Sequence, residues 1–360
     1  MKRPLAVVLL AVLLACGPEP PAEVAEPAAP PPVDFDCRFW RPLESGTGAS
    51  FRGLSAVDDQ VVWVSGTSGT WGLSLDGGST WSMRTIPGAE TLDFRDVDAF
   101  DSQTAYLMSA GPGELSRIYK TVDGGDTWTL QWVNGEQGFF DGMAFWDTER
   151  GLVYGDPVDG RFEVLATQDG GATWTRVQAE RMPGALPDEA GFAASGSGLA
   201  VLPGGHAWFG TGGPDARVFR STDYGQSWTA VSTPMLSGSG PTGIFSLAFS
   251  DPMTGIVVGG DYTQPEATAR NAARTTDGGV TWSLLDGAKP SGYRSGVAFA
   301  PQSGGAVVIA VGTSGADFSR DGGTTWEPMG EPTLNAVAFG ESRCAGWAVG
   351  PDGGIFRLGE

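Results

Sequence analysis

The sequence is poor in the side chains that most often carry catalysis and metal binding. Its 360 residues contain one histidine, His206, and three cysteines. A single imidazole speaks against a histidine-based metal site and against a Ser-His-Asp triad. The preceding Gly204-Gly205 pair predicts that His206 is a turn residue. We therefore expect no metal ion and no cofactor.

Basic residues are also scarce. The chain has 22 Lys and Arg against 42 Asp and Glu, a formal net charge of −20, and no basic cluster with interleaved aromatic residues. This charge excludes nucleic acid and an anionic membrane surface as partners, because both repel an acidic protein. Only 18% of the residues are charged, and no segment after the N-terminal region shows sustained helical periodicity, so surface helices are not expected.

Long apolar runs are absent except near the N-terminus. Two basic residues precede an apolar run from Leu5 to Ala15, which is too short to span a bilayer. This pattern predicts a secretory signal peptide over residues 1–15. Residues 13–16, Leu-Leu-Ala-Cys, resemble the lipobox of bacterial lipoproteins, and the resemblance implies cleavage before Cys16 and lipidation of that residue. The alternative is an ordinary signal peptide with an incidental cysteine.

Residues 16–36 are rich in proline and contain almost no large apolar side chain before Phe35. Such a segment cannot bury a core and stays extended, at ~3.1 Å per residue. We interpret it as a tether between the lipid and the folded part. Gly17 after the cysteine favours the outer membrane if the sorting habit of bacterial lipoproteins applies. The folded part would then face the periplasm or the cell exterior and touch the membrane only through the anchor.

Glycine, by contrast, is abundant: 56 residues, about twice the average share, which indicates many tight turns. Six segments share the pattern Ser/Thr-x-Asp-x-Gly-x-x-Trp, with tryptophans 44 to 54 residues apart. We call these segments the repeat turns. They are Ser74–Trp81, Thr121–Trp128, Thr167–Trp174, Ser221–Trp228, Thr275–Trp282 and Ser319–Trp326. A period of this length fits one four-stranded blade of a β-propeller.

The chemistry of each repeat turn is structural. An Asp in a tight turn accepts hydrogen bonds from backbone N–H groups, the Gly supplies a positive φ, and the Trp packs against the blade. The predicted structural acids are Asp76, Asp123, Asp169, Asp223, Asp277 and Asp321. Before the turns, a strand ending in Ala-Phe recurs at Phe94–Phe100, Phe140–Phe145, Ile244–Phe249, Arg294–Phe299 and Leu334–Phe339.

At both ends of the folded region, some predicted strands do not belong to a complete four-stranded blade. Three predicted strands follow the sixth repeat turn with no fourth, and residues 39–43 read as a fourth strand with no first three. Together they predict a seventh blade, so residues 37–360 form an all-β, seven-bladed β-propeller closed by its own termini. Cys37 and Cys344 would then lie on one face, where a secreted compartment permits a disulfide. The alternative is two unrelated buried thiols.

The repeats resemble Asp-box (BNR) propellers, and most closely the photosystem II assembly and stability factors and their bacterial lipoprotein relatives. The resemblance covers about residues 38–358. It rests on Phe-Arg at the start of inner strands (Phe51-Arg52, Phe94-Arg95), on Gly346–Gly350, and on the recurring Thr-x-Asp-Gly-Gly-x-Thr-Trp. It implies a non-catalytic scaffold that binds protein partners during assembly of a membrane complex. It does not imply that the partner is a photosystem.

Function is expected on loops at the mouth of the channel. The longest loops there are predicted at Ala179–Phe192, Ser232–Ile244 and Gly259–Arg274. Arg52, Arg95 and Arg294 occupy equivalent places in three repeats, each after an aromatic residue. They are candidates for binding a carboxylate or other anion. The further candidates are Tyr293, Asp156, Glu189 and Asp261, with Arg217 and Asn271 in the same loops. The alternative is that these arginines pair with nearby acids such as Asp96 and only fix the loops.

Two functions remain open on the sequence. We favour a non-catalytic scaffold for protein partners in or near the membrane, with an acidic or carbohydrate ligand at the channel mouth. The alternative is a sialidase-like glycoside hydrolase that uses the same arginines with Tyr293, Glu189 and Asp156. Two carboxylates ~5–10 Å apart in the pocket that holds the arginines would distinguish the second function from the first.

Overall fold

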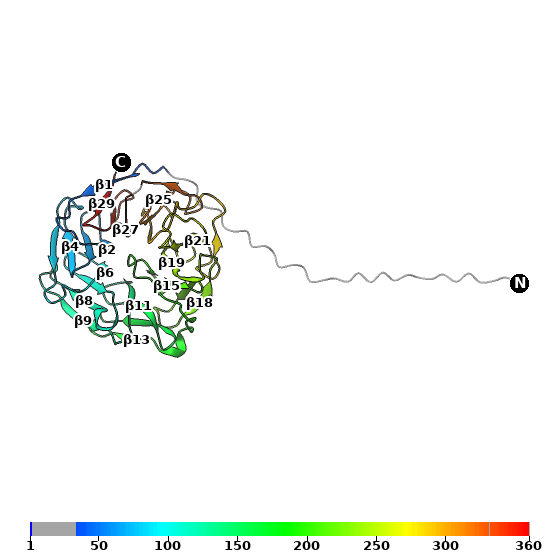
Figure 1. The fold of residues 1–360 in the computed structure, drawn as a ribbon, viewed down its shortest axis with the longest axis horizontal. Helices are drawn as coiled ribbons and strands as arrows, with labels where there is room; N and C mark the ends of the chain where they lie inside the picture. Colours follow the sequence, from blue (N-terminus) through cyan, green and yellow to red (C-terminus); the bar gives the residue numbers. More distant parts are fainter. Residues whose placement is uncertain (2–33, 331, 360) are drawn as a thin grey trace.

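A computed structural model describes Met1, residues 34–330 and residues 332–359. The expected signal peptide, Cys16 and nearly all of the expected tether lie outside the described residues. The described chain forms seven antiparallel sheets arranged as a ring (Figure 1). It contains two single-turn 3-10 helices, η1 (Gly113–Leu115) and η2 (Ala179–Arg181). No helix in the described ranges is long and apolar enough to cross a membrane.

The first four blades follow the chain in order. Blade 1 contains β2 (Phe51–Ala56), β3 (Val62–Gly66), β4 (Thr70–Ser74) and β5 (Ser82–Thr85). Blade 2 contains β6 (Phe94–Ala99), β7 (Ala105–Ser109), β8 (Arg117–Thr121) and β9 (Thr129–Val133). Blade 3 contains β10 (Phe140–Phe145), β11 (Gly151–Val158), β12 (Arg161–Thr167) and β13 (Thr175–Arg176). Blade 4 contains β14 (Leu199–Leu202), β15 (His206–Gly210), β17 (Arg217–Ser221) and β18 (Thr229–Ser232).

The last three blades complete the ring. Blade 5 contains β19 (Ser239–Phe249), β20 (Gly255–Asp261), β21 (Ala272–Thr275) and β22 (Ser283–Leu284), and β16 (Gly212–Gly213) joins its inner edge. Blade 6 contains β23 (Gly296–Phe299), β24 (Val308–Gly312), β25 (Gly315–Ser319) and β26 (Glu327–Pro328). Blade 7 contains β27 (Ala336–Phe339), β28 (Gly346–Val349), β29 (Ile355–Gly359) and β1 (Phe39–Leu43).

The two ends of the folded chain close the ring, as predicted. Strand β1 pairs antiparallel with β29, from Phe39 opposite Gly359 to Leu43 opposite Ile355. Figure 1 shows these two strands side by side, one from each end of the colour scale. A disulfide joins Cys37 to Cys344, with Cα atoms 5.6 Å apart. The seventh blade and the predicted disulfide are therefore confirmed.

Some predicted boundaries are wrong. The loop predicted over Ser232–Ile244 is in part strand, because β19 begins at Ser239 and pairs with the short β16. The first strands predicted from Arg294 and Leu334 begin two residues later. The N–H groups of Arg294 and Leu334 instead donate to carbonyls of the preceding blade, at 3.2 and 3.1 Å.

The six repeat turns have one shared geometry. In each, one Asp oxygen accepts from the backbone N–H four residues later at 2.8–2.9 Å, and the other accepts from the hydroxyl of that residue at 2.5–2.7 Å. The hydroxyl of the Ser or Thr that opens the turn also donates to the Asp. In Asp76, Asp123 and Asp169 these bonds, the hydroxyl bond first, lower the pKa. The Ser or Thr before each Trp is thus part of the turn.

Large aromatic residues on the second strands connect neighbouring blades. The indole of Trp208 donates to the Gly278 carbonyl at 2.8 Å, and the Tyr106 hydroxyl donates to the Gly170 carbonyl at 2.7 Å. Trp347 reaches the Gly77 carbonyl of blade 1 at 3.2 Å. These side chains bury a large apolar surface and satisfy their one polar atom at the next blade, so they help to set the packing angle between blades.

Candidate functional site

A cavity of about 370 Å³ lies where the inner parts of several blades meet. We call it the channel pocket. Its lining comes from five blades and from the connection before β14. The lining residues are Arg52, Arg95, Phe192, Ala193, Ala194, Phe245, Tyr262, Tyr293, Ser295, Thr313 and Asn335. Two of the three candidate arginines and Tyr293 are therefore in one pocket.

One segment, residues 192–197, connects opposite sides of the ring. Its carbonyls at Ala194 and Ala193 accept hydrogen bonds from Arg52 at 3.1 Å and from Arg95 at 3.2 Å. On the other side, the Ser195 hydroxyl donates to the Ser295 carbonyl at 2.6 Å. We call residues 192–197 the crossing segment. It forms part of the pocket wall and holds the two guanidinium groups in place.

The two pocket arginines differ in their partners. Arg95 pairs with Asp93, Nε to Oδ2, at 2.8 Å. Arg52 makes no direct ion pair with any carboxylate in the described part of the chain; it donates to the Ala194 carbonyl, and the carboxylate of Asp93 acts on it only from a distance. Burial, then the charge of Arg95, lowers the pKa of Arg52. A half-buried guanidinium without a direct ion pair favours an anion in the same pocket.

Arg294, the third candidate, does not line the channel pocket. Its side chain is completely buried, and its Nε donates to Asp317 Oδ2 at 2.7 Å. Its two terminal nitrogens also donate hydrogen bonds of 2.8–3.0 Å to the Tyr293 carbonyl and to the hydroxyls of Ser314 and Ser291. Arg294 therefore fixes its loop, while its neighbour Tyr293 turns toward the pocket. The expected convergence of three arginines is reduced to two.

Aromatic rings form the apolar side of the channel pocket. Phe192 and Phe245 stack with ring centroids 3.8 Å apart, and Tyr293 contacts Phe245 edge-on at 4.8 Å. Tyr262 is half exposed at the rim, 6.0 Å from Phe245. Burial raises the pKa of Tyr293, so its hydroxyl stays neutral. The pocket thus presents guanidinium groups on one side and aromatic carbon on the other.

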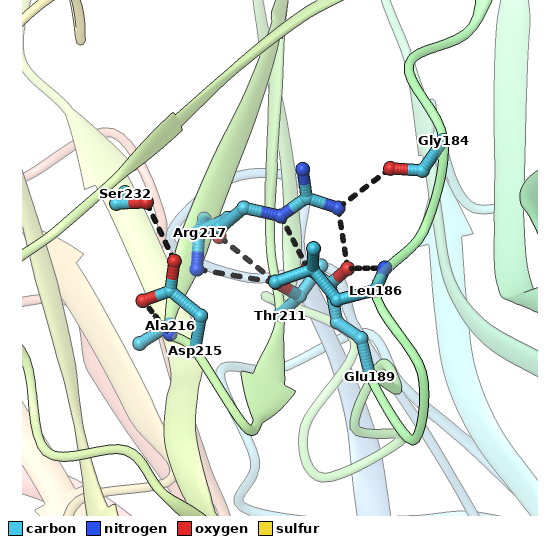
Figure 2. Close-up of polar contacts among 8 residues, drawn as sticks. All are labelled: Gly184, Leu186, Glu189, Thr211, Asp215, Ala216, Arg217 and Ser232. Atoms are coloured by element: carbon cyan, nitrogen blue, oxygen red, sulfur yellow. Dashed lines mark hydrogen bonds and ion pairs between the residues drawn. The ribbon is translucent and has the colours of Figure 1, made fainter.

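Glu189 lies outside this pocket and fixes a loop. Figure 2 shows its carboxylate buried between Arg217, Thr211 and the backbone of Leu186. Arg217 Nε donates to Glu189 Oε1 at 2.8 Å, and the Leu186 N–H donates to Oε2 at 2.8 Å. Arg217 also donates to the Gly184 carbonyl at 2.9 Å. The pair holds residues 184–189 in place and leaves Glu189 without a free lone pair for a ligand.

The other candidate residues also hold loops. Asp156 accepts from the Gly191 N–H at 2.9 Å, just before the crossing segment, and burial raises its pKa. Asp156 and Glu189 line a separate, open cavity of about 700 Å³. Asp261 accepts from the N–H and hydroxyl of Thr263 and from the Gln264 amide, so it closes a turn. Asn271 donates to the carbonyls of Pro290 and Gly292.

Sequence reasoning missed two acids on β6, Asp96 and Asp98, of which Asp96 is buried against Gly196 of the crossing segment. The alternative interpretation paired the candidate arginines with nearby acids such as Asp96. Arg95 and Arg294 do pair with acids, Asp93 and Asp317. Asp96 itself accepts from the Met143 N–H of blade 3 at 2.7 Å. Asp98 accepts from the Phe145 N–H at 2.8 Å. Burial raises the pKa of Asp96 to about 8 and that of Asp98 to about 7. The Asp-x-Asp pattern within a strand that otherwise reads as buried was the available signal.

Metal-binding clusters are not found in the described ranges: no group of three or more His, Cys, Asp or Glu side chains there could hold an ion. The channel pocket itself presents guanidinium groups and aromatic rings to a ligand.

Fold and pocket together define a seven-bladed β-propeller with an arginine-containing pocket among its inner strands. No protein-family model matches the sequence, and the comparison with curated proteins gives no significant match. Solved structures do match. YCF48 bound to a D1 peptide is 17% identical with a TM-score of 0.63, over 92% of this chain and 99% of that one. YCF48 from Cyanidioschyzon merolae is 17% identical with a TM-score of 0.60, over 89% and 98%.

A third match is an ancestral GH74 enzyme, 14% identical with a TM-score of 0.62. It covers 88% of this chain but only 46% of that enzyme. At these identities the matches show the propeller fold and leave function to be argued from the site.

Proposed function

We propose that this protein is a non-catalytic binding or assembly scaffold whose channel pocket takes an acidic segment of a protein partner. The observation that carries the proposal is Arg52, a half-buried guanidinium in the pocket wall that makes no direct ion pair in the described part of the chain. A ligand carboxylate would complete this pair through charge-assisted hydrogen bonds. Phe245 and Tyr293 offer an apolar surface to a neighbouring side chain of the same ligand.

A known propeller of similar shape supports a peptide ligand. YCF48, which has the same fold over nearly its whole length, has been solved with a D1 peptide bound. That structure concerns YCF48 and its peptide. For this chain it supports a protein segment as the class of ligand and leaves the partner's identity to experiment.

The pocket favours binding over glycoside hydrolysis. A glycosidase needs two carboxylates across the scissile bond. The lining of the channel pocket includes no Asp or Glu among the described residues. Glu189 and Asp156, the acids expected in that role, lie in another cavity and are bound to Arg217 and the Gly191 backbone. The GH74 enzyme has a similar fold, but the lining of the channel pocket does not supply the pair of carboxylates that glycoside hydrolysis needs.

We further propose that the propeller is exported and held at a membrane by lipid on Cys16, with its partners in or near that membrane. The proposal rests on the apolar run and Leu-Leu-Ala-Cys at residues 13–16 and on the proline-rich residues that follow. The disulfide between Cys37 and Cys344 supports an oxidising compartment.

Titration with a fluorescent peptide of alternating Glu and Phe tests the binding proposal. We expect binding that weakens with added salt, because salt screens the partly exposed charges. Arg52→Gln should weaken it by about tenfold, as for one lost charge-assisted hydrogen bond of ~1.5 kcal/mol. Arg84→Gln is the matched control, since Arg84 is an exposed arginine of the same blade that pairs with Asp126.

Two results would contradict the proposal. Equal affinity of the Arg52→Gln and Arg84→Gln variants would remove the channel pocket as the binding site. Turnover of an oligosaccharide by the wild type that is lost on Arg52→Gln would replace the scaffold with the hydrolase.

A further inference from the structure

A second cavity, of about 670 Å³, lies between blades 3 and 4 beside their repeat turns. We call it the rim groove. Its lining is drawn from the connection between β10 and β11, the third and fourth repeat turns, and the chain around β13. The lining residues are Trp146, Arg150, Ala166, Thr167, Gln168, Thr173, Thr175, Arg176, Val177, Gln178, Arg181, Tyr224, Gly225 and Gln226.

The rim groove contains a strained residue that the other repeat turns avoid. Tyr224 has φ +60°, the left-handed region. The equivalent position in the other five repeat turns is glycine, at φ +65° to +74°. These are Gly77, Gly124, Gly170, Gly278 and Gly322. A bulky side chain in this conformation costs of order 1 kcal/mol or more, and such strain collects at functional sites.

The strained tyrosine supports an aromatic and cationic wall. Its ring contacts Trp146 edge-on, with centroids 5.1 Å apart. The guanidinium of Arg150 lies 4.9 Å from the tyrosine ring centroid, a cation–π contact that fixes the arginine. Trp146 in turn donates from its indole to the His206 carbonyl at 3.0 Å, which orients its ring. Tyr224 thus positions two groove side chains as well as lining the groove.

The groove is cationic in a strongly acidic protein. Three arginines line it, while no Asp or Glu does so among the described residues. Arg176 is neutralised by Glu163, and Arg150 lies 3.8 Å from Asp147, at the outer limit of an ion pair. Arg181 is exposed and makes no ion pair within the described ranges. On a chain with a net charge of −20, the unpaired Arg181 and the loosely paired Arg150 at one groove favour an anionic ligand.

We propose that the rim groove is a binding site for an acidic saccharide, a sugar chain that carries uronic acid carboxylates. The exposed amides of Gln168, Gln178 and Gln226 each offer a donor and an acceptor, which matches sugar hydroxyls. Arg150 and Arg181 match the uronate carboxylate, and the indole of Trp146 offers apolar surface to the carbon face of the sugar ring. The groove differs in lining and position from the channel pocket, so this site does not depend on the proposed scaffold function.

Calorimetric titration with a trimer of galacturonic acid tests the site on the full-length protein. The matched ligands are a neutral galactose trimer and tri-glutamate. We expect binding of the galacturonate trimer, at least about tenfold weaker binding of the other two, and about tenfold loss on Arg181→Gln. Arg84→Gln, which removes an exposed arginine in blade 1, should leave the affinity unchanged.

Tyr224→Gly separates a ligand role from a structural one. Glycine fits φ +60° without strain, as in the five other turns, so a ligand role predicts an unchanged or higher melting temperature with about tenfold weaker saccharide binding. A lower melting temperature with unchanged affinity would overturn the proposal. Equal binding of tri-glutamate would also overturn it and would indicate a general site for acidic peptides, as would failure of the galacturonate trimer to bind.

Discussion

At the scale of single residues, two acids on β6 show how burial changes the protonation of a side chain that has a structural role. Asp96 and Asp98 lie along β6 and each accepts a backbone N–H of β10. Their pKa values, raised to about 8 and about 7, show that burial outweighs these hydrogen bonds. Both acids therefore bind a proton more tightly in the folded protein than in the unfolded chain.

The raised pKa of Asp96 predicts a pH dependence of stability. An unfolded Asp titrates near pH ~4, so unfolding releases a proton at any pH between this value and about 8. The contribution to the free energy of unfolding is complete below the unfolded pKa and is lost as pH rises through the folded one. The melting temperature should fall between about pH 5.5 and about pH 8.5, and Asp96→Asn should reduce that fall.

The Asn variant keeps a carbonyl oxygen for the Met143 N–H, so it removes the titration with little change in packing. Differential scanning calorimetry at constant ionic strength gives the two melting temperatures. An equal fall in wild type and variant would show that Asp96 does not take up the proton.

Arg294, which is fully buried, and Arg52, which is half-buried, provide a comparison of a paired and an unpaired arginine. Arg294→Ala leaves Asp317 as an unpaired buried carboxylate and should destabilise the fold by roughly 3–5 kcal/mol. Arg52→Ala removes a cation without an ion pair and should change stability much less while it weakens binding of an acidic peptide. Chemical denaturation of both variants measures the difference. Similar losses of stability would mean that Arg52 is also structural.

At the scale of elements, the repeat turn explains why so much of the fold could be predicted. Each turn satisfies its Asp, opening hydroxyl and glycine within eight consecutive residues, so one pattern predicts one hairpin. Six hairpins at blade spacing then predict the ring, and the unmatched strands at the two ends predict its closure. These features depend on contacts that are local or that repeat.

The tryptophan of each turn carries much of the packing, and Trp174 provides the test. Its ring is buried to 8% exposure and meets Phe145 edge-on at 6.0 Å. Trp174→Ala should lower the free energy of unfolding by roughly 3–5 kcal/mol. Leu130→Ala, at a 45% exposed position on β9, is the control and should cost little. A loss of ligand binding without loss of stability in the Trp174 variant would show that the turn is functional.

The candidate site was harder to predict, because it depends on contacts between distant residues. The crossing segment meets Arg95 across 98 residues and Arg52 across 142 residues of sequence. Arg52, Arg95 and Arg294 occupy equivalent places in their repeats, yet Arg294 is bound to the buried Asp317, Arg95 pairs with Asp93, and Arg52 makes no direct ion pair in the described ranges. Equivalent sequence positions therefore did not give equivalent surroundings: Arg52 and Arg95 lie in β2 and β6, whereas Arg294 precedes β23.

At the scale of the whole molecule, side chains satisfy the backbone where inner strands of neighbouring blades meet. The Ala99 N–H donates to the Ser55 hydroxyl at 3.1 Å, and the Val297 N–H donates to the Ser246 hydroxyl at 2.9 Å. Between blades 7 and 1, the Asn335 amide donates to the Phe51 carbonyl at 2.7 Å. A ring whose inner edges are paired in this way leaves no open sheet edge at its centre.

The proposed anchor sets where the whole propeller works. If Cys16 carries lipid, Cys16→Ser should move the protein from the membrane fraction to the soluble periplasmic or secreted fraction, because one anchor holds the entire chain. Immunoblots of separated fractions measure the shift, and Cys37→Ser controls for the loss of any cysteine. Continued membrane association of the Cys16 variant would contradict the lipid anchor.

The ring is closed within blade 7, by a disulfide and by the pairing of strands from the two ends of the folded chain. The disulfide joins residues 307 positions apart and lies next to the pairing of β1 with β29. In the chain-entropy model a link of this length restricts the unfolded chain and contributes ~4 kcal/mol or more. The double variant Cys37→Ser with Cys344→Ser should therefore unfold at lower denaturant concentration and with a steeper slope, because the unlinked unfolded chain exposes more surface. Wild type under reducing conditions should match it, and a variant as stable as the oxidised protein would show that β1 alone closes the ring.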